Sequence, residues 1–248
     1  MISNHQKMPE KYTKIKKIYE GKAKKLYTLK GHRGLLLQEF KDDATAFNAL
    51  KKGKIQNKGI INCELTAFIF TYLAKKGVKN HFVKQISENE MLIKQLKIVP
   101  IEVVIRNIAA GSLLKKTKFK EGHELSKPIV EFYYKDDSLG DPMISDSHAL
   151  AMKIATEKDL KTLKQMAEKI NSLLKPFFRK KGLKLVDFKL EFGKDSTGRI
   201  MLGDEITPDT CRLWDVKTNK KLDKDRFRFD LGGVNEAYAE VRKRILGK

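Results

Sequence analysis

The chain has 248 residues, 41% of them hydrophobic, which is enough for one large globular domain or two modest ones and too much for a disordered protein. Its 52 lysines and arginines against 31 aspartates and glutamates give a net charge of +21, so an anionic partner must be considered. No apolar run is long enough to cross a membrane, no signal-peptide pattern is visible, and the two cysteines have no metal-ligand spacing. We therefore expect a cytoplasmic protein without a membrane partner.

The positive charge comes mostly from lysine, with 43 lysines and nine arginines scattered along the chain. Base readout and phosphate clamps favour arginine, and no recognised nucleic-acid motif is present. A lysine-rich surface with an anionic small-molecule substrate explains the charge more simply, so no nucleic-acid partner is expected.

The first motif lies in KIKKIYEGKAKKLY, from Lys14 to Tyr27, where Gly21 interrupts a strand-like pattern. A glycine beside Lys22 and Lys24 can fold over phosphates, because bare backbone N–H groups and ammonium charges attract anions. The spacing is not that of a P-loop, and an exposed basic hairpin is the alternative. Residues 35–40 predict a buried strand paired with this segment.

The segment Lys41–Gly59 is polar and too irregular for one element. Ile60–Lys76 has apolar residues at helical spacing, which predicts a helix with a core stripe, and Val78–Ile86 returns to a strand pattern. We expect residues 1–86 to form a small β-rich lobe and residues 87–248 a larger lobe.

IVPIEVVIRNIAAGS predicts a strand that delivers Arg106 at its end, followed by a tight turn of small residues. Ser112 would cap a helix from Leu113, where free N–H groups attract anions. Together with Arg106 this makes a candidate seat for a phosphate monoester. A capped helix beside a surface arginine is the alternative.

The remaining elements follow simple patterns. Residues 129–134 predict a strand that leads into an aspartate-rich loop. Residues 156–181 give the clearest helix pattern, with Thr156 and Asp159 as a capping box, and an amphipathic helix from Val234 ends the chain.

The central stretch reads LVDFKLEFG, KDSTGRI and MLGDEITPDTCR, and its alternation predicts a half-buried strand followed by a hairpin. Asp187, Lys189 and Glu191 share one strand face, and the hairpin would bring Asp204 and Glu205 close to it. Carboxylates that converge from two strands suit Mg²⁺. A cross-strand ladder of ion pairs is the alternative.

Six blocks, GKAKKLY, VPIEVVIRNIAAGS, EFYYKDDSLGDPMIS, LVDFKLEFG, LGDEITPDTCRLWD and DKDRFRFDLGG, resemble those of the phosphoribosylaminoimidazole-succinocarboxamide synthase (SAICAR synthetase) family, from about Tyr19 to the C-terminus. The resemblance implies an α+β fold (two α/β lobes) related to ATP-grasp enzymes, with the nucleotide between the lobes. It also implies an ATP- and Mg²⁺-dependent ligase of purine biosynthesis that joins carboxyaminoimidazole ribonucleotide (CAIR) to L-aspartate through an acyl phosphate. A homodimer is expected.

The same resemblance implies roles for individual residues. The residues expected at ATP are Gly21, Lys22, Ala23, Lys24 and Lys135 near the phosphates and Lys84 by the adenine. The residues expected at the ribonucleotide are Arg106, Ser112 and Arg212 for its phosphate and Asp187 and Lys189 for its imidazole and carboxylate. The metal ligands would be Glu191 and Asp204, and the candidate catalytic residues are Lys189, Asp187 and Asp209.

The general base for the aspartate amine is left open between Asp209 and Asp141, no covalent nucleophile is expected, and Asn48 is given no role. Two alternatives remain open. One is another ATP-dependent carboxylate–amine ligase of the same fold, which substrate competition would reveal. The other is a basic nucleic-acid-binding protein, which would show salt-sensitive retention of unrelated DNA or RNA and no ATPase activity.

Overall fold

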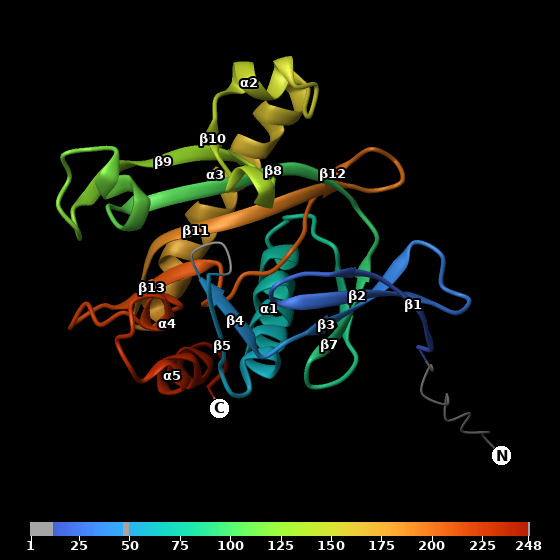
Figure 1. Cartoon of the computed structure of the whole chain (residues 1–248), viewed down its shortest axis with the longest axis horizontal. Helices are drawn as coiled ribbons and strands as arrows, with labels where there is room; N and C mark the ends of the chain where they lie inside the picture. Colours follow the sequence, from blue (N-terminus) through green and yellow to red (C-terminus); the bar gives the residue numbers. More distant parts are fainter. Residues whose placement is uncertain (1–11, 47–49, 248) are drawn as a thin grey trace.

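The computed structural model describes residues 12–46 and 50–247, and Asn48 lies outside them (Figure 1). Within these ranges the chain forms two antiparallel sheets, a two-stranded ribbon and flanking helices, which confirms the α+β class. The first sheet has the order β1 (Lys14–Glu20), β2 (Lys24–Leu29), β3 (Leu35–Phe40), β7 (Glu90–Lys94), β6 (Phe82–Gln85). The ribbon is β4 (Asp43–Ala46) with β5 (Lys51–Lys54). The polar segment that seemed too irregular for one element therefore holds two short strands.

The second sheet is built around one long strand, β11 (Leu183–Lys194). Its order is β10 (Met143–Ile144), β9 (Glu124–Tyr134), β8 (Lys97–Ile108), β11, β12 (Ile200–Leu202), with β13 (Cys211–Asp215) also paired to β11. β12 and β13 occupy the same edge of β11, one at each end, while β8 runs along the other edge. The predicted hairpin is confirmed, and Leu202 lies opposite Phe192.

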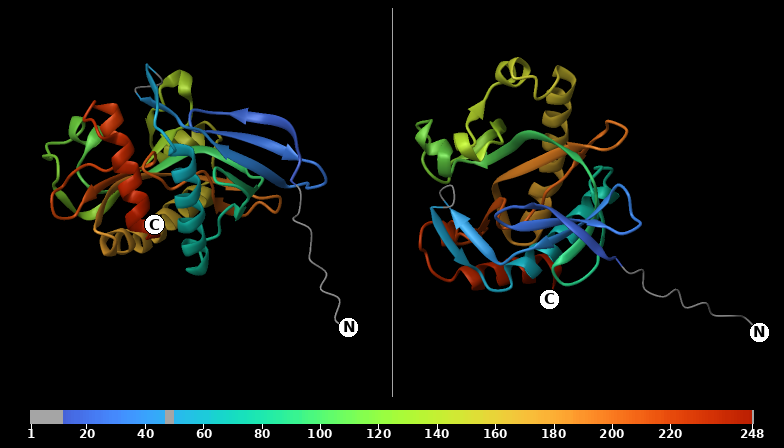
Figure 2. Two further views of the ribbon diagram at one scale, coloured as in Figure 1. Left: turned by 90° about the horizontal axis from the view of Figure 1, so that it is seen from below. Right: turned by 45° about the vertical axis from the view of Figure 1, so that its right-hand side comes forward.

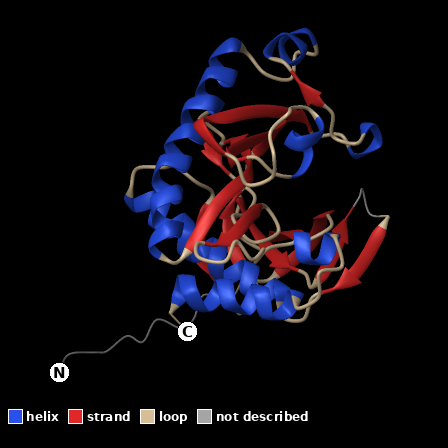
Figure 3. Cartoon of the chain, turned by 90° about the vertical axis from the view of Figure 1, so that its left-hand side faces the viewer, coloured by secondary structure: helices blue, strands red, loops and turns tan. Residues whose placement is uncertain are grey.

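Helices lie around and between the two sheets. They are α1 (Lys58–Lys75), α2 (Asp146–Ala151), α3 (Glu157–Lys180), α4 (Asp225–Arg228) and α5 (Val234–Leu246), with 3₁₀ turns η1 (Gly111–Lys115) and η2 (Asp137–Leu139). In Figure 3 the long helices run along the outside and the strands lie inside. Thr156 and Asp159 form the predicted capping box at the start of α3. No helix in the described ranges has the length and apolarity needed to span a membrane.

Helix α1 is buried on more than one side because it packs between the two sheets. Cys63 and Ala67 join the core of the first sheet, with Leu36 and Met91. Other side chains of α1, such as Leu65, join the large core that includes β8, β11, α3 and α5. Figure 2 shows α1 beside α5. An apolar surface on several sides is what such a position requires.

The boundary between the sheets differs from the predicted one. β7 follows residue 86 in the chain yet pairs with β3 in the first sheet, so sheet membership changes between Lys94 and Lys97. A backbone bridge between Asn80 and Leu202 links the two halves. The division into a small and a large lobe remains our proposal, with its boundary moved to this linker.

Candidate active site

Asp187 is the centre of the first group of site residues. It lies on β11 directly opposite Arg106 of β8 on one side and Arg212 of β13 on the other. Its Oδ2 accepts hydrogen bonds from Nη1 of both arginines, at 2.9 Å each. A shift in the β11–β13 register between Leu185 and Asp187 brings this about. One carboxylate therefore orients two guanidinium groups side by side.

Arg106 is held from four directions. In addition to Asp187, it donates to Glu131 at 2.7 Å, to Ser112 Oγ at 2.9 Å and to the Tyr133 hydroxyl at 3.2 Å. Burial alone would lower the pKa of this guanidinium, but Asp187 and Glu131 raise it, so the charge persists inside the protein.

The predicted capping role of Ser112 is wrong. The residue lies within η1, where Ala110 is the N-cap and makes no side-chain capping bond. The Ser112 hydroxyl instead contacts Arg106, so the two residues still meet as predicted. The short turn forms because Gly111, with φ +56°, reverses the chain where small residues follow β8.

Gly111 also makes room for Arg212. A Cβ at this position would lie 2.6 Å from Arg212 Nη2. We expect Gly111→Ala to raise the KM for the ribonucleotide about tenfold, because it displaces Arg212 and strains the backbone by about 1 kcal/mol. Gly198→Ala is the matched control. Gly198 has φ +79° and open space around it, so its alanine variant strains the backbone but displaces no neighbouring side chain. Equal KM values for the two variants would contradict the role given to Gly111.

A second group of site residues surrounds Glu191. On β11, Lys189 lies two residues after Asp187, and Glu191 lies four residues after it. Glu191 lies opposite Glu102 of β8, and Lys189 bonds both carboxylates, at 2.9 and 2.6 Å. Like charges placed opposite each other across a sheet repel, so Lys189 is needed there. Lys135 makes a further ion pair with Glu191.

These ammonium groups determine the charge of Glu191. Burial would raise the pKa of this carboxyl, but Lys189, Lys135 and Lys24 hold it well below its usual range. Burial would likewise lower the pKa of Lys189, but Glu191 and Glu102 keep it well above the ordinary value. Both groups are charged at neutral pH, as a site for phosphates or a cation requires.

Asp204 follows β12 and completes this cluster. Its carboxylate pairs with Lys24, and its carbonyl oxygen lies 3.2 Å from His81 Nε2. Burial, with Lys24 nearby, lowers the pKa of His81 to about 3, so the ring is neutral. Lys22, exposed beside Gly21, reaches Asp137 at 2.7 Å. The glycine-lysine motif and the hairpin thus meet at one place.

Lys84 lies apart from these lysines. It is exposed on β6, and its Nζ lies 4.7 Å from the centre of the Tyr12 ring. Since β3 and β7 separate β6 from β2, the strands carrying Lys84 and Lys24 are about 14 Å apart. A role for Lys84 at the adenine stays a prediction.

Asp209 is enclosed by donors. Lys58 Nζ and Asn62 Nδ2 donate to Oδ2 at 2.6 and 3.0 Å, and the Tyr238 hydroxyl donates to Oδ1 at 2.7 Å. Burial would raise the pKa of Asp209, but Lys224 and Lys58 hold it well below its usual range. These bonds are unfavourable for a general base, because such a base must accept a proton from the substrate. A role for Asp209 as the general base stays a prediction, and its bonds here hold Lys58 and Asn62 in place. Asp141 accepts a hydrogen bond from the Asp136 backbone in its own loop.

We expect Asp209→Asn to lower the free energy of unfolding by about 3 kcal/mol or more, because Lys58 is fully buried and would lose its counter-ion. Urea unfolding measures this change. Asp230→Asn is the control, since Asp230 pairs with Lys51 at 2.5 Å but is 86% exposed. That variant is expected to lose less than about 1 kcal/mol. A loss of similar size in both variants would contradict the argument.

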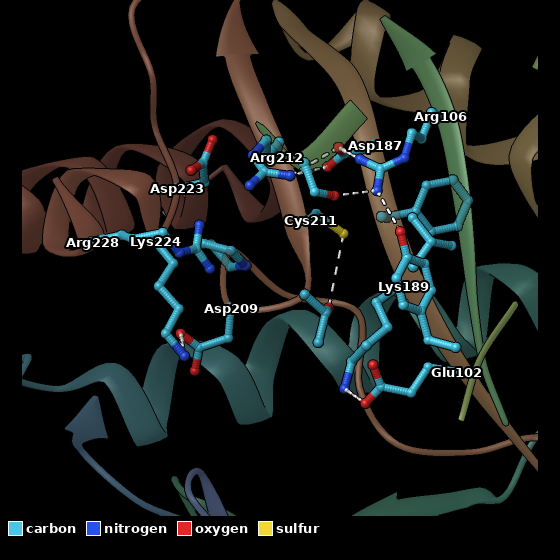
Figure 4. Close-up of a pocket in the computed structure, with 16 residues that line it drawn as sticks. Glu102, Arg106, Asp187, Lys189, Asp209, Cys211, Arg212, Asp223, Lys224 and Arg228 are labelled. Atoms are coloured by element: carbon cyan, nitrogen blue, oxygen red, sulfur yellow. Dashed lines mark hydrogen bonds and ion pairs between the residues drawn. The ribbon is translucent and has the colours of Figure 1, made fainter. Parts of the chain in front are cut away.

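One cavity of about 300 Å³ joins several of these residues (Figure 4). The predicted residues that line it are Arg106, Ser112, Asp187, Lys189, Asp209 and Arg212. It lies on the face of the second sheet whose polar residues alternate with core residues such as Leu190. Lys24, Lys135, Glu191 and Asp204 belong to the neighbouring cluster around Lys189 rather than to the wall of this cavity, and Gly21 and Ala23 do not line the cavity either.

Other residues of the cavity received no role from the sequence. Among them are four with polar or charged side chains, Glu102, Tyr133, Lys224 and Arg228. Glu102 shares the polar face of its strand with Arg106, which was a usable signal. Lys224 and Arg228 stand in DKDRFRFDLGG, but their position beside Asp209 depends on how the chain folds after β13.

The fold and the site define a two-sheet α+β protein with a cavity lined by arginines, lysines and aspartates, beside a cluster of lysines and carboxylates. Comparison with known proteins identifies the family: the SAICAR synthetase family model matches residues 17–245. The chain belongs to this family.

Individual relatives agree. The phosphoribosylaminoimidazole-succinocarboxamide synthase of Chloroherpeton thalassium is 59% identical over 230 residues, which cover 93% of this chain and 97% of the relative. The enzyme of the same name from Wolinella succinogenes is 56% identical, over 94% and 99% of the two chains. A solved SAICAR synthetase (Type-2) in complex with ADP is similar with a TM-score of 0.90 and 49% identity, over 93% and 97% of the two chains.

Proposed function

We propose that the chain is an ATP-dependent ligase that joins CAIR to L-aspartate and yields SAICAR, ADP and phosphate in purine biosynthesis. Family membership supports the reaction, and the ADP in a similar structure supports the nucleotide. One observation carries the proposal at the level of this chain. A single strand, β11, places the carboxylate that pairs Arg106 with Arg212 next to the Lys189–Glu191 cluster.

The proposed chemistry follows from the substrates. A carboxylate and an amine do not condense in water, so a carboxylate oxygen of CAIR first attacks the γ-phosphorus of ATP and ADP leaves. The aspartate nitrogen then attacks the acyl carbon, phosphate leaves, and the nitrogen gives up its proton. Such steps depend on position and charge neutralisation, and no side chain needs to become a covalent nucleophile.

The residues divide between the two anionic groups of CAIR and the nucleotide. Arg106, Ser112 and Arg212 bind the ribonucleotide phosphate, since paired guanidinium groups and a hydroxyl suit its oxygens. Lys189 and Asp187 face the imidazole and its carboxylate. The nucleotide phosphates are held by the lysines at the glycine-lysine motif and by Lys135, and its adenine by Lys84.

Glu191 and Asp204 are the two carboxylates proposed to bind Mg²⁺. They lie close together, since Lys24 pairs with Asp204 and also interacts with Glu191. Among the described residues no group of three or more His, Cys, Asp or Glu side chains could hold a metal. Two carboxylates suffice for Mg²⁺ when phosphate and water supply the other oxygens. When bound, the ion would neutralise the charge of the transferring phosphoryl group. We expect that Mg²⁺ binds together with the nucleotide.

The test is ADP release from Mg²⁺-ATP, with L-aspartate and CAIR omitted in turn. ADP that forms only in the complete mixture, with SAICAR as co-product, supports the proposal. ADP that forms with CAIR alone supports the acyl phosphate, intercepted by water. No ADP in the complete mixture, from protein that melts cooperatively, contradicts the proposal. ADP that forms with a different acid in place of CAIR identifies another ligase of this fold.

A cytoplasmic homodimer remains part of the proposal. Cys63 and Cys211 are both free and buried, which suits a reducing compartment. Size-exclusion chromatography with light scattering tests the dimer.

A further inference from the structure

The cavity has three charged corners, and the proposed function uses two of them. Figure 4 shows Arg106 with Asp187 and Arg212 in one corner, Lys189 with Glu102 in a second, and Lys224 with Asp209 in a third. CAIR has one phosphate and one carboxylate, which match the first two corners. The third corner has no anionic group of CAIR to bind.

Cations share carboxylates in this corner, where the buried Glu205 also acts on Lys224 and Lys58. Lys224 Nζ lies 3.7 Å from Asp209 Oδ1, but the same carboxylate is already bonded by Lys58 at 2.6 Å. Arg228 pairs with Asp225, which also accepts Arg212 Nε at 2.8 Å. Each of the two carboxylates therefore serves two cations.

Asp223 contributes only part of a negative charge. Its two oxygens accept the backbone N–H groups of Leu213 and Asp225, at 2.8 Å each. Burial raises its pKa to about 7, so it is only partly ionised at neutral pH. Burial and neighbouring cations also lower the pKa values of Lys224 and Arg228. A bound anion would relieve the repulsion between these cations.

We propose that Lys224, supported by Arg228, binds a carboxylate of the co-substrate L-aspartate in this third corner. The inference rests on the proposed function and adds the site of the second substrate. L-aspartate carries two carboxylates, and its amine must approach the CAIR carboxylate from a side that CAIR does not fill. The Lys224 side chain lines the cavity and is 15% exposed, so it is placed for that contact.

The first test is steady-state kinetics of the full chain with Lys224→Gln. The KM for L-aspartate is expected to rise about 10- to 100-fold, the loss of one charge-assisted hydrogen bond. The KM values for CAIR and ATP should stay within about twofold, which also shows that the variant is folded. Lys224→Arg should restore much of the L-aspartate affinity. Lys221→Gln is the matched control, because Lys221 is nearby but pairs with Glu121 outside the cavity.

The second test needs no turnover: L-aspartate is titrated calorimetrically into the protein with Mg²⁺-ADP present. The inference is supported if the wild type binds L-aspartate and the Lys224→Gln variant does not. This result would count even if the ADP-release test had contradicted the proposed reaction. An unchanged KM for L-aspartate, or an equal rise in the KM for CAIR, would overturn it. So would L-aspartate binding that is the same in both proteins.

Discussion

Replacing Glu191 with glutamine is expected to lower kcat by about 1000-fold or more, with the KM for CAIR within about threefold. Three ammonium groups, Lys189, Lys135 and Lys24, keep this buried carboxyl ionised. The glutamine amide carries no negative charge to bind Mg²⁺. The three ammonium groups also lose the carboxylate that balances their charge. The arginines around Asp187 are untouched, so CAIR should still bind. Initial rates of ADP release at saturating substrate concentrations measure the effect.

Glu157→Gln is the matched control, since Glu157 is exposed in the first turn of α3 and should leave kcat unchanged. Equilibrium titration of ADP with and without Mg²⁺ separates loss of the ion from loss of the nucleotide. If Glu191→Gln turns over normally, Glu191 is not a metal ligand.

Replacing Arg106 with alanine is expected to raise the KM for CAIR about 100-fold or more and to change kcat by less than about tenfold. The variant lacks the guanidinium proposed to bind the ribonucleotide phosphate. It also leaves Asp187 and Glu131 without a buried partner. A loss of stability of about 3 kcal/mol should accompany it. The kinetic assays should therefore be run well below the melting temperature of the variant.

Arg199→Ala provides the comparison, because Arg199 is 70% exposed in the hairpin between β11 and β12 and pairs with Asp195. It should leave both constants unchanged. Equal, mild effects of Arg106→Ala and Glu191→Gln on ATP affinity alone would contradict the division of roles between the two residues.

Strand alternation accounts for much of what the sequence predicted correctly. Asp187, Lys189 and Glu191 lie on one face of β11 because side chains of a strand alternate, and that pattern is visible in LVDFKLEFG. The helices α1, α3 and α5 follow from their apolar residues at helical spacing, and the start of α3 follows from its capping box as well.

Pairing between distant segments could not be predicted in the same way. Lys58 meets Asp209 across 151 positions, and Glu102 lies opposite Glu191 only because of the β8–β11 register. Period and composition contain no information on register. The predicted cap at Ser112 failed for a local reason, since Gly111 reverses the chain and η1 starts two residues before the predicted helix start at Leu113.

The length of β11 has a consequence for substrate choice. Asp187 and Glu191 are four residues apart on one extended strand, so about 13 Å separates the arginine pair from the proposed metal carboxylates. A β-strand hydrogen-bonded along both edges cannot stretch to change this distance. The proposed site therefore selects substrates by length: an imidazole carboxylate without its ribose phosphate reaches only one of the two anchoring points.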